Sequence, residues 1–348
     1  MNRKDQQRID PSKIKKVLLI RLRRIGDVIL TTPAVSALRK AFPSALISYI
    51  VEEPYKELVE GNPCLNNVYV LKKKQNSKDF LKFIRQIRKE KVDVVIDFHS
   101  GPRASLITLF SGAKLKIGYR IKYRNFIYDV KLSRSSERGP IHSVENHINL
   151  VKALGISVDP SFPVSVPEAK KEEAEKVEKI IRENEFKGHS IITIHISAGN
   201  EFRDWGADNW IQMTNLLAQQ PEVRIVLVGA EEDKKAEEEI LKKSKAAILS
   251  LVGRLNLREL REVISHSSLF VGPDSGPMHI AATTSTPIVA LFGPTLPANF
   301  APWKAKATLI EKNLDCRPCK QRTCIHDDFR CLKTIKPEEV YAACLHFI

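Results

Sequence analysis

Short apolar runs alternate with stretches of helical period along most of this chain of 348 residues. Residues 17–22 form the first apolar run, and residues 28–41 carry the first helical pattern, with Pro33 early in it, where proline costs little. Short apolar runs joined by helical patterns are typical of parallel strands with crossover helices. We therefore expect a βα unit here, further strands at residues 45–51, 67–71 and 92–97, and helices near residues 79–90, 103–110 and 144–154.

Residues 156–168 interrupt this pattern, because they contain three prolines and have no helical period. We expect a linker there, followed by a second series that begins with a charged helix at residues 168–185. Its strands are expected at residues 191–196, 224–228, 248–251, 269–271 and 288–291, and its helices at residues 207–218, 231–243, 257–265 and 276–283. The whole pattern predicts the α/β class, with two doubly wound, Rossmann-like domains facing a central cleft.

The domain boundaries follow from these two series. Residues 1–160 are expected to form an N-terminal domain, residues 161–335 a C-terminal domain, and residues 336–348 a last helix that returns to the first domain. The length and the 43% hydrophobic content suffice for two cores. The longest apolar runs are far shorter than the roughly 20 residues that span a bilayer, and the charged N-terminus does not resemble a signal peptide. We therefore predict a cytoplasmic protein.

The net charge of +15 is distributed unevenly. Residues 1–168 contain 31 Lys and Arg against 16 Asp and Glu, whereas residues 169–348 contain 25 of each kind. A one-sided basic domain favours an anionic partner, such as a phospholipid surface, a phosphorylated glycolipid or nucleic acid; a solvated basic face is the alternative. Nucleic acid is disfavoured, because the sequence has no helix-turn-helix, RNP or KH signature and its basic residues are not interleaved with stacking aromatics.

The first motif that suggests chemistry is RLRRIGD, which ends at Asp27 between the first strand and its helix. Gly26 is expected to allow a tight turn there. Asp27 then lies near the helix N-terminus at the mouth of the expected cleft, where a carboxylate either caps the helix or acts as a general base for an attacking hydroxyl. The absence of a G-x-G-x-x-G motif disfavours a nicotinamide dehydrogenase.

Two further motifs follow strands of the second domain. VGPDSGPMH places Asp274, Ser275 and Gly276 at a helix start, where a hydroxyl and unpaired backbone N–H groups suit a diphosphate or sugar hydroxyls. Alternatively, Asp274 only caps the helix and His279 only packs in the core. In the motif SAGNEFRDWG, Arg203 either neutralises a leaving diphosphate or is an ordinary surface arginine.

These three motifs, in this order, resemble the ADP-heptose:lipopolysaccharide heptosyltransferase family. The resemblance covers nearly the whole chain from Lys15 onward, and its most specific stretches are RRIGDVILTTPAVSALRKAFP, VGPDSGPMHIAATTSTPIVALFGPT and CRPCKQRTCIHDDFRCLKTI. It implies a GT-B glycosyltransferase with the acceptor on the N-terminal domain and the nucleotide sugar on the C-terminal domain. The implied reaction moves L-glycero-D-manno-heptose from ADP-heptose onto the inner core of lipopolysaccharide, with inversion and release of ADP.

The resemblance also implies roles for individual residues. Asp27 matches the family's proposed base, Arg203 stands where the family has a lysine that contacts the donor phosphates, and Glu231 is the candidate for an acid that contacts ribose. The family's donor-binding stretch D-[ST]-G-x-x-H is matched by Asp274, Ser275, Gly276 and His279. Acceptor contacts are expected from basic residues of the first domain, namely Arg23, Arg24, Arg103, Arg120 and Arg124.

No D-x-D triplet occurs in the sequence, so we expect charge neutralisation by Arg203 and helix N-termini rather than by a divalent cation. Four cysteines with the spacing C-x2-C-x4-C-x6-C fit either a structural zinc or iron–sulfur site or reduced, partly packed thiols, and they are Cys316, Cys319, Cys324 and Cys331. The lipid-linked acceptor implies peripheral association with the anionic cytoplasmic face of the inner membrane. The alternatives are a GT-B transferase for another nucleotide sugar and a non-catalytic protein that binds anionic surfaces.

Overall fold

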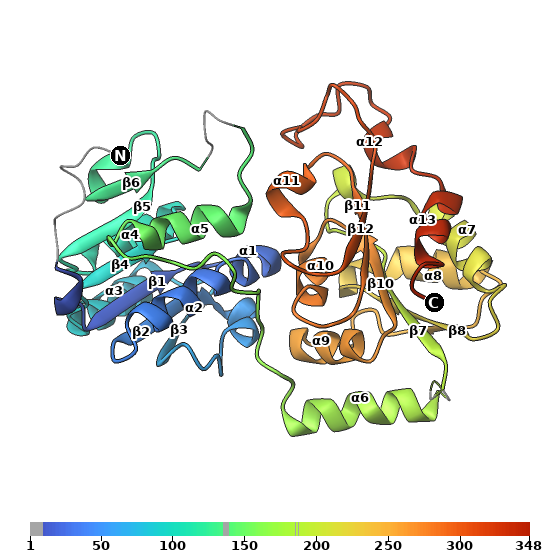
Figure 1. The fold of residues 1–348 in the computed structure, drawn as a ribbon, viewed down its shortest axis with the longest axis horizontal. Helices are drawn as coiled ribbons and strands as arrows, with labels where there is room; N and C mark the ends of the chain where they lie inside the picture. The colour runs from blue at the N-terminus through green and yellow to red at the C-terminus, as the bar shows by residue number, and fades with distance from the viewer. Residues whose placement is uncertain (1–9, 135–138, 185, 187) are drawn as a thin grey trace. The chain divides into compact units, whose positions relative to one another are not determined.

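The computed structural model describes residues 10–134, 139–184, 186 and 188–348. The chain divides into two compact units, Met1–Pro167 and Glu168–Ile348 (Figure 1). The division falls later than the expected end at residue 160, because the proline-bearing segment still packs on the first unit. The N–H of Ser165 donates to Thr32 Oγ1 at 2.9 Å, and Val164 and Val166 are buried.

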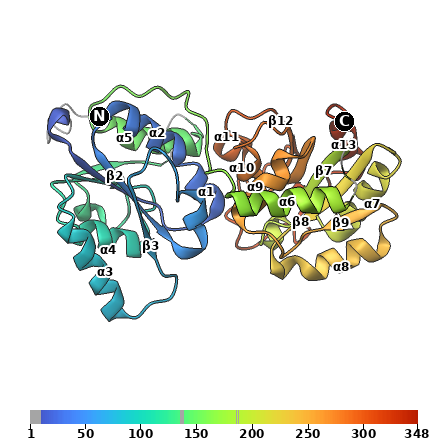
Figure 2. The same cartoon turned by 90° about the horizontal axis from the view of Figure 1, so that it is seen from below.

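The first unit is built on a six-stranded parallel sheet with the order β3-β2-β1-β4-β5-β6. Helices α3 and α4 pack together on one face of it, and α2 and α5 pack together on the other (Figure 2). The strands are β1 (Lys16–Ile20), β2 (Leu46–Glu52), β3 (Asn67–Leu71), β4 (Val94–Asp97), β5 (Leu115–Tyr119) and β6 (Val130–Leu132). The helices are α1 (Ile25–Ile29), α2 (Thr32–Ala41), α3 (Ser77–Lys89), α4 (Pro102–Phe110) and α5 (Ser143–Lys152).

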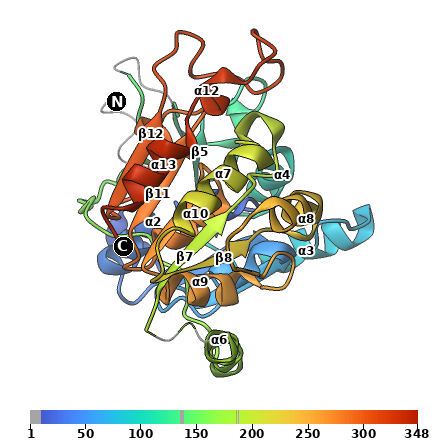
Figure 3. The same cartoon turned by 90° about the vertical axis from the view of Figure 1, so that its right-hand side faces the viewer.

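The second unit has its own six-stranded parallel sheet with the order β12-β11-β10-β7-β8-β9. Helix α7 lies beside α8 and α13, and α6 packs on α9 (Figure 3). The strands are β7 (Ser190–His195), β8 (Val223–Val228), β9 (Ile248–Ser250), β10 (Leu269–Pro273), β11 (Ile288–Phe292) and β12 (Ala307–Glu311). The helices are α6 (Lys171–Glu183), α7 (Ala207–Leu217), α8 (Lys234–Lys243), α9 (Leu257–Ser265), α10 (Gly276–Ala281), α11 (Pro297–Phe300), α12 (Arg330–Lys333) and α13 (Pro337–Cys344).

The two sheets have the same connectivity. Counted from the first strand of each unit, both follow the order 3-2-1-4-5-6 of the Rossmann fold, which confirms the two doubly wound α/β domains. The strand order reverses between β1 and β4 in the first unit and between β7 and β10 in the second. Ligands of such sheets bind outside the carboxyl ends of the strands at this switch point. The loops after these four strands are therefore the places where each unit is expected to bind its ligand.

Buried aliphatic side chains explain why the central strands are visible in the sequence. Leu18 and Ile20 of β1 pack with Ile84 of α3 and Ile107 of α4 in one cluster of buried residues. Alternate residues of a strand point to opposite faces, so Leu19, which is also fully buried, faces the other helical layer. A strand covered on both faces is apolar at every position, and β1 shows that pattern.

Some elements differ from the sequence prediction. The sequence does not predict β5, β6 or β12. β6 has only three residues and β12 is half-buried, so pairing with a neighbouring strand rather than local hydrophobicity orders these two edge strands. β5 is largely buried, but Lys116 and Gly118 interrupt its apolar pattern. The helix expected at residues 28–41 is interrupted at Leu30 and Thr31 and forms α1 and α2. Pro33 at the start of α2 explains this break, because proline has no N–H to continue a helix.

The last helix, α13, packs against α7 of the second unit. Gln220 Nε2 donates to the Tyr341 hydroxyl at 2.7 Å, and Trp205 Nε1 donates to the carbonyl oxygen of Ile335 at 2.9 Å. Val340 also joins the buried core of this unit. These contacts anchor the helix within the second unit, in contrast to the expected return to the first domain. In the part of the chain that the structure describes, no helix is long and apolar enough to cross a bilayer.

Candidate active site

Asp27 lies in α1, after the carboxyl end of β1 at the first switch point. Its carboxylate pairs with the guanidinium of Arg21, which also donates from Nη1 to the carbonyl oxygen of Phe98 at 2.8 Å. The Asp27 side chain is 31% exposed, whereas that of Arg21 is 7% exposed. A partly exposed carboxylate oriented by a buried cation is suited to accept a proton from a bound hydroxyl group.

The turn before α1 differs from the expectation. Its left-handed residue is Arg24, with φ 70°, while Gly26 is buried inside the helix. The prediction of a turn at Gly26 is therefore wrong, because α1 already begins at Ile25. The helix has no side-chain cap hydrogen bond, so the interpretation of Asp27 as a helix cap is also wrong. Its carboxylate is instead bound by Arg21, a partner that sequence reasoning did not single out.

The loop after β4 brings Asp97 and His99 to the same switch point. Asp97 is fully buried and accepts hydrogen bonds from the Tyr128 hydroxyl at 2.7 Å and the His99 N–H at 2.9 Å; burial raises the pKa of this carboxyl. Burial, and after it the charges of Arg21 and Arg23, lower the pKa of His99 to about 4. Its neutral imidazole has a buried Nδ1 with no hydrogen-bond partner among the described residues.

The five arginines expected to bind the acceptor lie in three places. Arg23 and Arg24 are exposed in the turn before α1. Arg120 and Arg124 belong to the loop after β5, where Arg120 is exposed and Arg124 donates to a serine hydroxyl of α4 at 3.2 Å. Arg103 lies in α4 and lines a pocket. The structure therefore does not gather these residues into one cluster.

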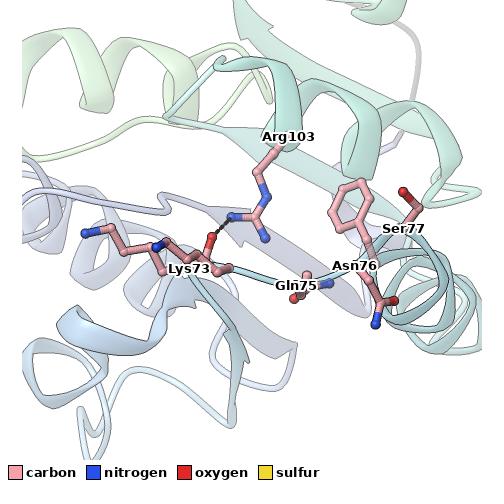
Figure 4. Close-up of a pocket in the computed structure, with 7 residues that line it drawn as sticks. Lys73, Gln75, Asn76, Ser77 and Arg103 are labelled. Carbon is pink, nitrogen blue, oxygen red and sulfur yellow. Dashed lines mark hydrogen bonds between the residues drawn. The ribbon is translucent and has the colours of Figure 1, made fainter.

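The pocket at Arg103 is a cavity of about 370 Å³ at the start of α3 and α4 (Figure 4). The Arg103 guanidinium pairs with Glu52 at 2.9 Å and donates to the carbonyl oxygens of Lys72 and Lys73 at 2.9 and 3.3 Å. Because these acceptors already satisfy Arg103, the more available cations of the pocket are the exposed Lys73 and Lys74. Sequence reasoning missed these lysines, since three consecutive lysines in a loop have no distinctive spacing.

Asp274 follows β10 at the switch point of the second unit, and its side chain is 5% exposed. Its Oδ2 accepts a hydrogen bond from the Thr295 hydroxyl at 2.5 Å and lies 3.3 Å from Nη1 of Arg203. The same Nη1 donates to the backbone carbonyl oxygen of Asp274 at 3.0 Å. Helix α10 has no side-chain cap hydrogen bond, so the interpretation of Asp274 as a simple helix cap is wrong. Asp274 fixes an arginine instead.

Gln321 provides a second contact that orients Arg203. Its Oε1 accepts hydrogen bonds from Arg203 Nε at 3.0 Å and from Asn200 Nδ2 at 2.9 Å. The Arg203 side chain remains 25% exposed, which leaves part of its guanidinium for an anion. Gln321 is separated from Arg203 by 118 positions and has no motif of its own, so sequence reasoning could not find it.

The donor-binding stretch expected from the sequence is divided between the switch point and the core. Nδ1 of His195, at the end of β7, lies 3.1 Å from the Ser275 hydroxyl, and burial lowers the pKa of His195 to about 4. Gly276 begins α10, and His279 lies inside that helix with only 4% of its surface exposed. His195 is therefore a neutral partner of Ser275 that the sequence did not indicate.

Glu231 lies farther along the same edge of the second sheet. It follows β8 in a short 3-10 turn, Glu231–Asp233, and β7 separates β8 from β10. Its carboxylate lies over Gly253, where an added Cβ would meet a Glu231 oxygen. Gly253 has φ +70°, so the backbone conformation favours glycine at this position.

The four clustered cysteines line one small cavity together with Phe202 and Phe329. All four thiols are free, and backbone N–H groups, first that of His326, lower the pKa of Cys324. Within the described ranges, no three His, Cys, Asp or Glu side chains are arranged to hold a metal ion. Phe202 and Phe329 meet edge to face with ring centroids 5.3 Å apart. The cysteine-bearing stretch thus packs beside the residues that hold Arg203.

Comparisons with known proteins identify the family. A model of glycosyltransferase family 9 (heptosyltransferase) matches residues 80–329. Lipopolysaccharide heptosyltransferase 3 of Escherichia coli K12 is 28% identical over 295 residues, covering 81% of this chain and 83% of that protein. The glycosyl transferase family 9 structure from Veillonella parvula has a TM-score of 0.88 at 23% identity, covering 97% of this chain and 98% of that one.

A second solved structure, the ADP-heptose lipopolysaccharide heptosyltransferase II of E. coli, has a TM-score of 0.77 at 22% identity, covering 95% of this chain and 98% of that one. Both structural likenesses extend over nearly the whole chain and confirm the expected two-domain GT-B fold. Since the family model matches well over half of the residues, the chain belongs to glycosyltransferase family 9 (heptosyltransferase).

Proposed function

We propose that this chain moves L-glycero-D-manno-heptose from ADP-heptose onto the inner core of lipopolysaccharide, with inversion at the anomeric carbon and release of ADP. Membership of the family and the names of its relatives support the substrate class. The observation that carries the proposal is the Arg21–Asp27 pair at the switch point of the first unit. A transferase needs such an oriented base, whereas a protein that only binds anionic surfaces does not.

In the proposed step, Asp27 accepts the proton of an acceptor hydroxyl while the oxygen of that hydroxyl attacks the anomeric carbon of the heptose. A new C–O bond forms as the bond between the anomeric carbon and the diphosphate oxygen breaks, and the departing ADP takes the electron pair of that bond. Attack from the side opposite the ADP inverts the configuration. A positioned base of this kind contributes about 10²–10⁴-fold to the rate.

The second unit would bind the donor. Arg203, held by Asp274 and Gln321, is placed to neutralise the negative charge that develops on the leaving diphosphate. Because a fixed cation serves the diphosphate, we expect transfer to proceed without a divalent cation. The remaining proposed donor contacts are Ser275, Gly276, His279 and Glu231, of which Glu231, after the strand on the other side of β7, would contact the ribose.

The first unit would bind the anionic acceptor. Its excess of basic residues supports this assignment, since phosphates and acidic sugars are bound by Arg and Lys. A lipid-anchored acceptor also implies that the enzyme works as a peripheral protein at the cytoplasmic face of the inner membrane. The proposed acceptor contacts are Arg23, Arg24, Arg103, Arg120 and Arg124, together with Lys73 and Lys74 of the pocket at Arg103.

The decisive measurement is ADP release from ADP-heptose with deep-core lipopolysaccharide acceptors in the presence of EDTA, comparing the wild type with Asp27→Ala. We expect acceptor-dependent release that survives EDTA and falls by about 10²–10⁴-fold in the variant. Asp159→Ala is a matched control, because Asp159 is an exposed carboxylate of the same unit outside both switch-point loops. This control should keep wild-type activity.

Three other outcomes would contradict the proposed function. If folded protein releases no ADP with any of several truncated acceptors, heptosyl transfer is contradicted. Acceptor-dependent release of a nucleoside diphosphate from a different nucleotide sugar would instead assign another donor to the same GT-B scaffold. Binding to anionic surfaces without any transfer would favour the non-catalytic alternative.

A further inference from the structure

Five large apolar side chains are exposed on neighbouring elements of the first unit. Leu81 of α3 is 46% exposed, Leu106 and Phe110 of α4 are 42% and 46% exposed, and Tyr123 and Phe126 of the loop after β5 are 82% and 75% exposed. Helix α4 contacts both α3 and the 3-10 turn Asn125–Ile127 within this loop, and α3 and α4 lie side by side in Figure 2. We call these five side chains the apolar face.

The two aromatic residues of the apolar face are held outward by an ordered loop. The Ile121 N–H donates to Asn125 Oδ1 at 2.8 Å, which closes the loop, and Ile127 is buried and anchors its end. The exposed rings of Tyr123 and Phe126 thus belong to a loop that is fixed by its own contacts. Exposed apolar surface is unfavourable in water by roughly 25 cal/mol per Å², so a contact that covers these rings would be favoured.

The segments that carry the apolar face are rich in basic residues. Residues 98–128 contain six Lys and Arg and no Asp or Glu. Lys122 Nζ lies 5.0 Å from the centre of the Tyr123 ring. On α3 the exposed basic side chains are Lys78, Lys82, Arg85, Arg88 and Lys89. An apolar patch beside basic residues matches a surface with an apolar interior and an anionic exterior. The apolar parts exclude water together, and the opposite charges attract.

We propose that the apolar face docks onto an anionic phospholipid bilayer, with Tyr123 and Phe126 at the level of the headgroups and the basic residues of α3 on the lipid phosphates. Aromatic side chains favour the membrane interface, and each Lys or Arg near an anionic leaflet strengthens the attraction. The aliphatic members Leu81 and Leu106 favour acyl chains over nucleic-acid bases, on which they cannot stack. The inference rests on the proposed function, since a lipid-anchored acceptor is presented at such a surface.

The test is cosedimentation of the full chain with phosphatidylcholine vesicles that contain or lack phosphatidylglycerol, at low and high salt, without donor or acceptor. We expect binding only with phosphatidylglycerol and weaker binding at high salt. The double variant Tyr123→Ser/Phe126→Ser should bind at least about tenfold more weakly, and Lys82→Gln and Arg85→Gln about fivefold more weakly each. The controls in the second unit are Leu241→Ser and Lys235→Gln, which alter an exposed apolar and an exposed basic residue of α8 and should bind as the wild type does.

Wild-type binding by the double variant, or equal binding to vesicles with and without phosphatidylglycerol, would overturn the proposal. The proposal would also be overturned if an oligonucleotide displaced the protein from vesicles and the double variant no longer bound that oligonucleotide. This result would assign the apolar face to nucleic acid. ADP release with a delipidated, water-soluble acceptor gives an independent readout, in which the double variant should match the wild type. Vesicle binding thus tests the apolar face even if the protein proves not to transfer heptose. Conversely, a lack of vesicle binding would not contradict the proposed transfer reaction.

Discussion

The two units have the same strand order but opposite balances of charge. Met1–Pro167 contains 31 Lys and Arg against 15 Asp and Glu, whereas Glu168–Ile348 contains 25 against 26. Because both sheets follow the Rossmann order, the backbone cannot be the source of this difference. The shared topology determines where each unit binds a ligand, and the side chains at the strand ends and on the surface determine which ligand it binds.

The carboxylates at the two switch points show the same contrast at atomic scale. Asp27 is 31% exposed and paired with one arginine, whereas Asp274 is 5% exposed and bound by both Arg203 and Thr295. An accessible carboxylate can exchange a proton with a bound hydroxyl group, but a buried and fully bonded one serves to orient its partners. Both aspartates lie at a switch point, but Asp27 follows the first strand of its sheet and Asp274 follows the fourth strand of the other. They are therefore expected to have different functions, and this difference can be tested.

The largest expected effect comes from replacing each aspartate by asparagine. Asp27→Asn should lower kcat by about 10²–10⁴-fold with little change in KM for ADP-heptose, because only the proton acceptor is lost. Asp274→Asn should mainly raise the KM for ADP-heptose, because it loosens Arg203. Steady-state ADP release at varied donor concentration measures both. Equal effects of the two substitutions on kcat and KM would contradict the functional division between the units.

The next largest effect is expected at Arg203. Arg203→Gln should reduce kcat/KM by about 10²–10³-fold, as does the loss of a single group that stabilises developing negative charge. Arg203→Lys should recover part of this loss, since it restores the charge without the planar geometry. The same ADP assay compares the three proteins. Full activity of Arg203→Gln would remove this residue from the donor site.

A smaller effect is expected when Arg203 is kept and its positioning residue is changed. Gln321→Met removes the oxygen that binds Arg203 and Asn200, so KM for ADP-heptose should rise by about tenfold while kcat changes less. Gln220→Met is the matched control, because Gln220 binds Tyr341 of the last helix. The control should lower the free energy of unfolding slightly and leave KM unchanged. A rise in KM for both variants would indicate a general loss of structure rather than a role for Gln321.

The smallest effect concerns stability and involves Asp97, a further aspartate at the switch point of the first unit. Burial raises the pKa of Asp97, so the folded state binds its proton more tightly than the unfolded state does. The protonated carboxyl therefore adds to the free energy of unfolding at low pH. This contribution is lost as the pH rises from the ordinary carboxyl pKa to the raised pKa, by at most about 1.4 kcal/mol per pH unit. In urea unfolding, the difference in the free energy of unfolding between the wild type and Asp97→Asn should decline over this pH range. A constant difference would contradict a raised pKa.

Much of the fold could be predicted because its elements have local causes. The strand before RLRRIGD and the strand before DSGPMH are covered on both faces, so they are apolar at successive positions and visible in the sequence. The edge strands β6 and β12 were not visible, because they are short or half-buried and pairing with a neighbour orders them. The buried strand β5 was not visible because Lys116 and Gly118 interrupt its apolar pattern. The position of α13 was also misjudged, since the sequence indicates an apolar side of a helix but not the surface that covers it.

The sequence alone determined the two α/β domains, the unequal charge, and the motifs that contain Asp27 and Asp274, because these depend on residue type and short spacing. Only the tertiary structure decided that Arg21 binds Asp27 and that Gln321 binds Arg203. It likewise decided that Leu81, Phe110 and Phe126 lie on neighbouring elements of one surface. Arg21 and Asp27 belong to one short motif, but their pairing depends on how the chain turns into α1. The other contacts join residues far apart in the chain, and chain spacing carries no information about them until the sheets and helices have packed.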